Sequence, residues 1–108
     1  MTAFRVFLDS ESMAEEISTS WRGQIQHAEK TDDVFSVVLS GGATAYQIYP
    51  NLANLKSLES IDWERVHIFW ADERCVSPKH KESNYLNIQR TFLSEVQIPE
   101  KNIHRIRG

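Results

Sequence analysis

VFSVVLSGGATAYQIY, residues 34–49, has the pattern of a strand, a glycine loop and a helix. The apolar, β-branched run Val34–Leu39 predicts the strand, which ends at Ser40-Gly41-Gly42. Two glycines let the backbone adopt conformations closed to other residues and approach a ligand closely. The first turn of the next helix offers unpaired N–H groups and the positive end of its dipole. Such a corner suits a phosphate or other anion, although an ordinary strand-to-helix turn looks the same. The candidate residues are Ser40, Gly41, Gly42 and Thr44.

A strand and a helix are expected before this segment. Phe4–Leu8 is a short apolar strand candidate. Ser12 followed by Glu15 has the capping-box pattern, and apolar residues at helical spacing then predict a helix from about Glu11 to Glu29. Val34–Leu39 lacks strict alternation of apolar and polar residues, which favours a strand covered on both faces, as in a parallel sheet.

One more strand and two helices are expected after the glycine loop. The first helix contains Pro50, which predicts a kink or two short helical pieces. Val66–Trp70 predicts the next strand, and Ser83 is a suitable N-cap for a last helix that Pro99 ends. The length of 108 residues allows one domain at most, and the order βαβαβα predicts that residues 1–108 belong to a single domain with an open, mostly parallel α/β sheet.

Charged residues follow the strand Val66–Trp70 directly. Ligands of open α/β sheets bind outside the carboxyl ends of the strands, where both the glycine loop and Asp72-Glu73-Arg74 are expected. The planar fork of Arg74 matches phosphate oxygens, and Asp72 can orient a catalytic histidine or water. A surface salt-bridge cluster is the competing interpretation, and the role of Glu73 stays open.

Composition and charge exclude several classes of protein. A net charge of −3 argues against a nucleic-acid binder that neutralises phosphates. No apolar run is long enough to cross a membrane, and the N-terminus lacks the pattern of a secretory signal. Together with the single cysteine, Cys75, this predicts a cytoplasmic protein. Residues 1–55 hold three Lys or Arg against seven Asp or Glu, so an anion site should draw its cations from the second half.

The remaining candidate groups are weaker. No zinc-type spacing is present, so no metal is predicted, and the absence of both common nucleotide-binding motifs disfavours a nucleotide. His67 is expected to be structural, whereas His80 and His104 can reach an anionic ligand but are expected at the solvated surface. Cys75 is expected to be buried or inert. Three aromatic residues are expected in the core: Trp63, Phe69 and Trp70.

Four segments together resemble the N-terminal part of the 6-phosphogluconolactonases. They are Leu39–Thr44, Val66–Val76, Ser83–Tyr85 and Pro99–Ile106, and they stand in the order and spacing of that family. The related glucosamine-6-phosphate deaminases typically have a tyrosine where this chain has Arg74, so this position favours the lactonase. Ala43 and Ala45 depart from the serine and proline that are frequent in the family.

The resemblance implies a Rossmann-like fold of the NagB/RpiA/CoA transferase-like type, with helices on both faces of the sheet. It implies hydrolysis of 6-phospho-D-glucono-1,5-lactone to 6-phosphogluconate in the pentose phosphate pathway, without a metal or organic cofactor. By position, Ser40, Gly41, Gly42 and Thr44 would hold the phosphate of the sugar phosphate with Arg74. Asp72 would orient the catalytic base, and Asn84 would lie near the substrate.

The family's catalytic base is a histidine in a glycine-rich motif, and no histidine of this sequence stands in such a motif. The chain is therefore expected to be an N-terminal part of a lactonase, with an incomplete sheet that invites self-association. A glucosamine-6-phosphate deaminase or isomerase and a non-catalytic phosphosugar-binding module are the alternatives.

Overall fold

A computed structural model describes residues 9–55, 58 and 60–106. It contains three α-helices, three strands and three short 3-10 helices among these residues: α1 (Ser10–Thr31), β1 (Phe35–Leu39), α2 (Ala43–Ala53), η2 (Trp63–Arg65), β2 (Val66–Trp70), α3 (Asn84–Thr91), η3 (Leu93–Glu95), η4 (Glu100–Asn102) and β3 (Ile103–His104). The strand expected at Phe4–Leu8 lies outside the described residues. The α/β class is confirmed.

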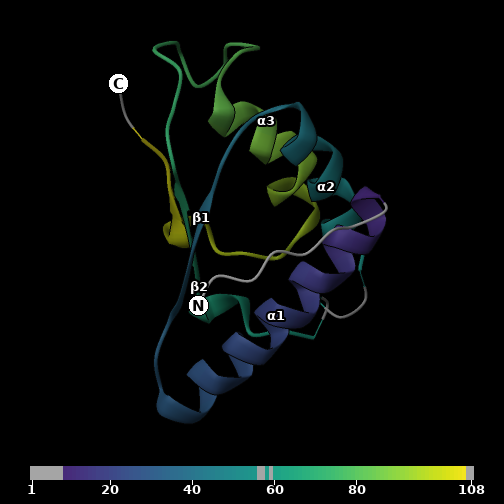
Figure 1. Ribbon diagram of the computed structural model, residues 1–108. Coiled ribbons are helices and arrows are strands. Elements are labelled where there is room, and N and C mark those ends of the chain that lie inside the picture. Colours follow the sequence, from purple (N-terminus) through teal and green to yellow (C-terminus); the bar gives the residue numbers. More distant parts are fainter. Residues whose placement is uncertain (1–8, 56–57, 59, 107–108) are drawn as a thin grey trace, which may run out of the picture.

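The three strands form one parallel sheet in the order β1-β2-β3. Phe35 pairs with Val66 at one end of the β1–β2 ladder, and Leu39 pairs with Trp70 at the other. The loops that follow these two strands therefore leave the sheet at the same edge (Figure 1). This is the edge at which the sequence predicts a ligand site.

β3 was not expected from the sequence. It has only two residues, and such a length shows no alternation of apolar and polar side chains. Asn102, just before it, is 2% exposed, and its side-chain amide donates to the backbone carbonyls of Trp63 (3.3 Å) and Glu64 (3.0 Å). These bonds tie η4 to η2 and so bring β3 alongside β2.

The described α-helices lie to one side of the sheet (Figure 1). Val37 and Leu39 are buried against them, whereas Val38, between the two, is 64% exposed. Phe69 on β2 is 38% exposed on the same open face. Successive side chains of a strand point to opposite faces. The expectations that Val34–Leu39 is covered on both faces and that Phe69 is a core residue are therefore wrong for the described part of the chain.

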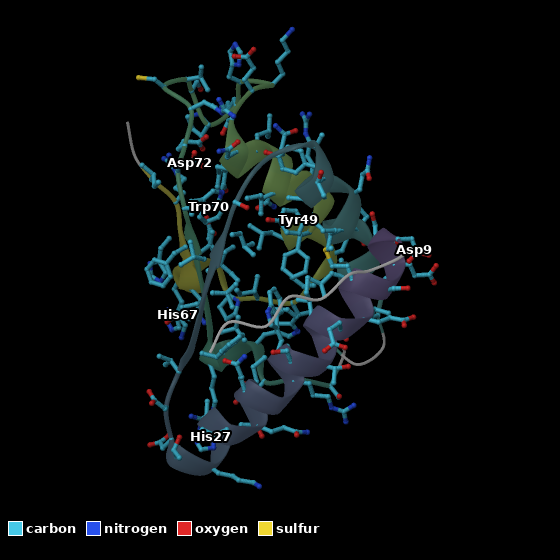
Figure 2. All side chains as sticks on the ribbon, in the orientation of Figure 1. Asp9, His27, Tyr49, His67, Trp70 and Asp72 are labelled. Carbon is cyan, nitrogen blue, oxygen red and sulfur yellow. The ribbon has the colours of Figure 1, made fainter. Side chains whose placement is uncertain are left out.

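Phe92 occupies the centre of the core. It is fully buried, and its ring makes edge contacts with Trp21 (centroids 5.9 Å apart) and Trp63 (6.3 Å) and a tilted contact with Tyr49 (6.1 Å). Figure 2 shows Tyr49 between the strands and the helices, the position from which its hydroxyl reaches the loop after β1. Trp63 and Trp70 are buried, as expected.

Two local expectations about helices need correction. Asp9, not Ser12, caps α1, because its carboxylate accepts the Ser12 N–H at 2.8 Å and the helix starts at Ser10. α2 continues through Pro50 as one helix, so the alternative of two short pieces is wrong. Ser83 caps α3 as expected, and its hydroxyl accepts the Leu86 N–H at 3.2 Å.

Candidate functional site

The loop after β1 presents the start of α2 at the carboxyl edge of the sheet. Gly42 is the N-cap residue with φ 122°, a conformation that L side chains rarely adopt. No side chain caps this end of α2. The Tyr46 N–H donates to the Gly42 carbonyl at 3.0 Å, so the three preceding N–H groups have no carbonyl within the helix to bind. They point toward the space beyond the strand ends, where an anion can accept them.

Tyr49 of α2 holds the start of this loop through a hydrogen bond. Its hydroxyl donates to the Ser40 carbonyl across 2.5 Å. Burial raises the pKa of the Tyr49 phenol despite this hydrogen bond, so the group is neutral and remains a donor at ordinary pH. The side chains of Ser40 and Thr44 are exposed.

Asp72 follows the end of β2 and is held by Asn84. The Asn84 side-chain amide donates to the Asp72 carboxylate (3.2 Å) and to its backbone carbonyl (3.3 Å). The carbonyl oxygen of the same amide accepts the Tyr46 hydroxyl at 3.1 Å. Tyr46 of α2, Asn84 of α3 and Asp72 after β2 are thus joined by one continuous series of side-chain hydrogen bonds.

Glu73 turns inward and holds the N-terminus of α3. Its carboxylate accepts the backbone N–H groups of Arg74 (2.7 Å), Asn84 (2.6 Å) and Tyr85 (2.9 Å) and the Ser83 hydroxyl (3.0 Å). Burial raises the pKa of this carboxyl, but the four hydrogen bonds together outweigh burial and hold the pKa below its usual value. The residue that the sequence left open therefore organises the loop between β2 and α3.

Arg74 completes the site. It lines a cavity of about 380 Å³ together with residues of α2, of α3 and of the loop before α3; the others are Gly42, Tyr46, Glu82, Asn84 and Asn87. The cavity brings together one glycine of the loop after β1, the expected cation and the expected substrate-proximal residue. Ser40, Gly41, Thr44 and Asp72 are not among the lining residues, although Gly41 and Asp72 contact Asn84.

Three cavity residues were not anticipated: Tyr46, Glu82 and Asn87. Tyr46 fits the apolar spacing of its helix, yet it lies one turn after Gly42, and this spacing was the signal available in the sequence. Asn87 lies one turn after Ser83 in the same way, and its amide donates to the Ser83 and Lys81 carbonyls, both at 2.9 Å.

None of the four histidines lines this cavity. His67 and His104 pair on the open face of the sheet, with Nδ1 and Nε2 2.9 Å apart, and His67 points away from the helices in Figure 2. His80 accepts the Glu82 N–H at 3.1 Å within the loop before α3. Cys75 is exposed, so of the two alternatives expected for it, a buried or an inert thiol, the buried one is wrong.

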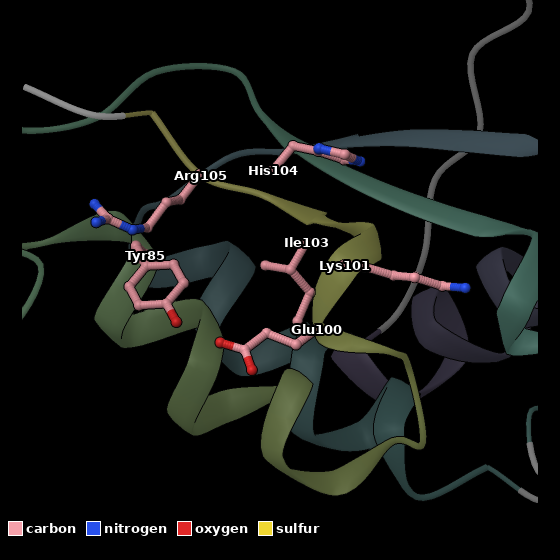
Figure 3. Close-up of a pocket in the computed structure, with 6 residues that line it drawn as sticks. All are labelled: Tyr85, Glu100, Lys101, Ile103, His104 and Arg105. Atoms are coloured by element: carbon pink, nitrogen blue, oxygen red, sulfur yellow. The ribbon is translucent and has the colours of Figure 1, made fainter.

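A second hollow, of about 590 Å³, lies between α3 and β3 (Figure 3). Figure 3 shows the Arg105 guanidinium beside the Tyr85 ring, and the guanidinium carbon lies 5.7 Å from the ring centroid. Lys101, another lining residue, forms an ion pair with Glu64 at 3.2 Å. This hollow contains no site residue predicted from the sequence and is separate from the cavity at Arg74.

The described residues contain no group of three or more His, Cys, Asp or Glu that could hold a metal ion. No described helix is long and apolar enough to span a bilayer.

Comparison with known sequences identifies related proteins. A family model described as glucosamine-6-phosphate isomerases/6-phosphogluconolactonase matches residues 8–108. A 6-phosphogluconolactonase of Aggregatibacter actinomycetemcomitans is 44% identical over 72 residues, which are 67% of this chain and 31% of that protein. A probable 6-phosphogluconolactonase 2 of Arabidopsis thaliana is 37% identical over 102 residues, 94% of this chain and 39% of that protein. The chain spans about a third of the length of these relatives.

Solved structures show the same fold. A 6-phosphogluconolactonase from Thermotoga maritima matches with a TM-score of 0.70 at 31% identity, over 87% of this chain and 41% of that one. A 6-phosphogluconolactonase from Shewanella baltica matches with a TM-score of 0.77 at 26% identity, over 100% and 44%. A monomeric glucosamine-6-phosphate deaminase has a TM-score of 0.72 at 16% identity, over 92% and 40%, and this likeness shows the fold alone.

Proposed function

The chain belongs to the glucosamine-6-phosphate isomerase and 6-phosphogluconolactonase family, and we propose that it forms the phosphosugar-binding part of a 6-phosphogluconolactonase. The observation that carries the proposal is the cavity shared by Gly42, Arg74 and Asn84 at the carboxyl edge of the sheet. The substrate in this proposal is 6-phospho-D-glucono-1,5-lactone. Relatives more than 30% identical bear the name of this activity, which favours the lactonase over the deaminase.

The proposed phosphate grip has two parts. The unpaired N–H groups of the first turn of α2 bind phosphate oxygens, with the hydroxyls of Ser40 and Thr44 beside them. Arg74, which lines the same cavity as Gly42, supplies the positive charge in a planar fork. Gly41 and Gly42 keep the loop free of side chains where the ligand approaches.

The proposed chemistry is attack of water on the lactone carbonyl. A general base removes a proton from the water, the ring ester bond breaks, and the protonated base returns that proton to the ring oxygen, which becomes a hydroxyl of the open-chain acid. We assign to Asp72 the orientation of that base and to Asn84 a place beside the substrate. No histidine of this sequence is assigned as the base, and the proposed reaction needs no metal or organic cofactor.

The proposal has two further parts. The substrate class belongs to the pentose phosphate pathway, and we place the protein in the cytoplasm, with no nucleic acid among its partners. The open apolar face at Val38 and Phe69 is proposed to let this chain self-associate at high concentration.

Calorimetric titration of the chain with 6-phosphogluconate tests the phosphate grip. Arg74→Ala is expected to weaken binding about tenfold or more, because it removes a charge-assisted pair of hydrogen bonds. Arg90→Ala is the matched control, since Arg90 is exposed in the last turn of α3 and does not line the cavity. Equal affinities of the two variants would contradict the proposed role of Arg74. Glucosamine 6-phosphate, titrated in parallel, measures the preference between the two substrate classes.

A further inference from the structure

Asn84 is the buried junction of the candidate site. The residue is 4% exposed, although its side chain is polar and stands at the first position of α3. A buried amide is costly unless its donors and acceptors are paired. The Asn84 amide is paired on both sides, with Tyr46 on one and Asp72 on the other.

The partners fix which way this amide points. Asp72 offers two oxygens to Asn84, one from its carboxylate and one from its backbone, and neither can donate a hydrogen bond. The NH₂ group must therefore face Asp72, and the amide oxygen must face the Tyr46 hydroxyl, which donates. In the flipped orientation, the amide oxygen would lie about 3.2 Å from a carboxylate oxygen, with no proton between them.

The loop after β1 closes this junction from a third direction. A methyl group placed on Gly41 would lie 2.3 Å from the Asn84 amide oxygen and 2.6 Å from the Tyr46 hydroxyl oxygen. The Gly41 backbone thus lies directly against the Tyr46–Asn84 hydrogen bond. Glycine is needed at position 41 for space, whereas it is needed at 42 for its backbone conformation.

We propose that Tyr46 is a positioning residue, which holds the Asn84 amide in the orientation that faces Asp72 and, through this amide, restrains the Asp72 carboxylate. No role for Tyr46 follows from the family resemblance, and the tyrosine was expected only as an apolar helix position. The inference rests on the proposed function for its purpose, because Asp72 is the group assigned to orient the base. The hydrogen-bonded chain itself is a property of the free protein and can be tested without a ligand.

Tyr46→Phe is the critical variant. It removes the hydroxyl and keeps the ring, whose centroid lies 6.3 Å from that of Tyr49 in the helix. Tyr85→Phe is the matched control, because no hydrogen bond of the Tyr85 hydroxyl is found within the described residues. Asn84→Ala removes the amide that joins Tyr46 to Asp72, so its spectrum shows how the Asp72 signal changes when that connection is lost.

The measurement is NMR of the ¹⁵N,¹³C-labelled chain without ligand. In the wild type and in Tyr85→Phe, the side-chain NH₂ of Asn84 should exchange with solvent more slowly than that of the exposed Asn54. In Tyr46→Phe, the protection of the Asn84 NH₂ should fall about two- to tenfold, the range expected for one lost hydrogen bond. The Asp72 side-chain ¹³C signal should move in the same direction as in Asn84→Ala.

Two results would overturn the inference. One is an Asn84 NH₂ that exchanges as fast as that of Asn54 in the wild type. The other is an Asp72 signal that moves with Asn84→Ala but not with Tyr46→Phe. Neither result depends on phosphosugar binding, so failure here and failure of the Arg74 titration are distinguishable.

Discussion

Replacing Glu73 by glutamine should destabilise the chain far more than its conservative chemistry suggests. The carboxylate accepts four hydrogen bonds, two at each oxygen. Glutamine keeps one oxygen and places an NH₂ group where the other was, so at least one backbone N–H then faces a donor, and the remaining hydrogen bonds lose their charged acceptor. Two hydrogen bonds to a charged group are worth about 3–6 kcal/mol together. Because Glu73 is partly exposed and its donors can turn to water, we expect a loss of about 2–4 kcal/mol.

The loss should also depend on pH in a defined direction. The pKa of Glu73 is held below its ordinary value of 4.5, so its stabilising contribution is fully present above that pH. The contribution is lost as the pH falls through the lowered pKa, where the carboxyl becomes neutral as glutamine is. The difference in unfolding free energy between wild type and Glu73→Gln should therefore be largest near pH 7 and shrink below pH 4.5.

Urea denaturation followed by circular dichroism at several pH values measures this difference. Glu29→Gln removes the same charge from an exposed position on α1 and should change the unfolding free energy by less than about 0.5 kcal/mol. The reasoning is refuted if Glu73→Gln is as stable as Glu29→Gln at pH 7. It is also refuted if the difference between Glu73→Gln and the wild type stays constant down to pH 3.

Three further predictions concern the loop, the core and the open face. Gly41→Ala should lower the unfolding free energy by about 1–3 kcal/mol in urea denaturation, because its methyl group overlaps Asn84. Gly23→Ala, with open space around it in α1, should raise the unfolding free energy by about 0.5–1 kcal/mol. The opposite order would contradict the close packing assigned to Gly41. Phe92→Ala should cost about 3–5 kcal/mol by the same measurement, and a cost below about 1 kcal/mol would show that the core is not centred there. Val38→Lys should reduce any concentration-dependent association seen by analytical ultracentrifugation, and unchanged association would place the contact elsewhere.

The sequence predicts strongly patterned elements well. The run Val66–Trp70 is observed with the predicted boundaries, because its short length and its β-branched and aromatic residues favour a strand over a helix. The Ser83 cap is also observed, since a hydroxyl three residues before an available N–H acts locally. β3 could not be predicted because its position depends on the distant amide of Asn102 rather than on its own two residues.

The sequence predicts the glycine loop and Arg74 as parts of the candidate site, but it does not predict Tyr46. The glycine loop and Arg74 carry recognisable chemistry, and parallel strands bring them to one side of the sheet. Tyr46 carries no recognisable chemistry, and its position one turn after Gly42 is only a weak signal, because a tyrosine at helical spacing is more often a core residue. Its hydroxyl acquires a role only when Asn84, 38 residues away, lies against it.

The three charged residues after β2 show why adjacency in sequence is a poor guide to shared function. The Asp72 carboxylate accepts a hydrogen bond from the side-chain amide of Asn84, whereas Glu73 turns into the protein and its carboxylate accepts the backbone N–H of the same residue. Arg74 lines the cavity, and its backbone N–H is in turn held by Glu73. A surface salt-bridge cluster would let these charges pair with one another, yet none of the ion pairs found among the described residues joins them. The central carboxylate therefore acts as the fixed point that holds Asn84 and Arg74 at one cavity, and its loss should disturb both together.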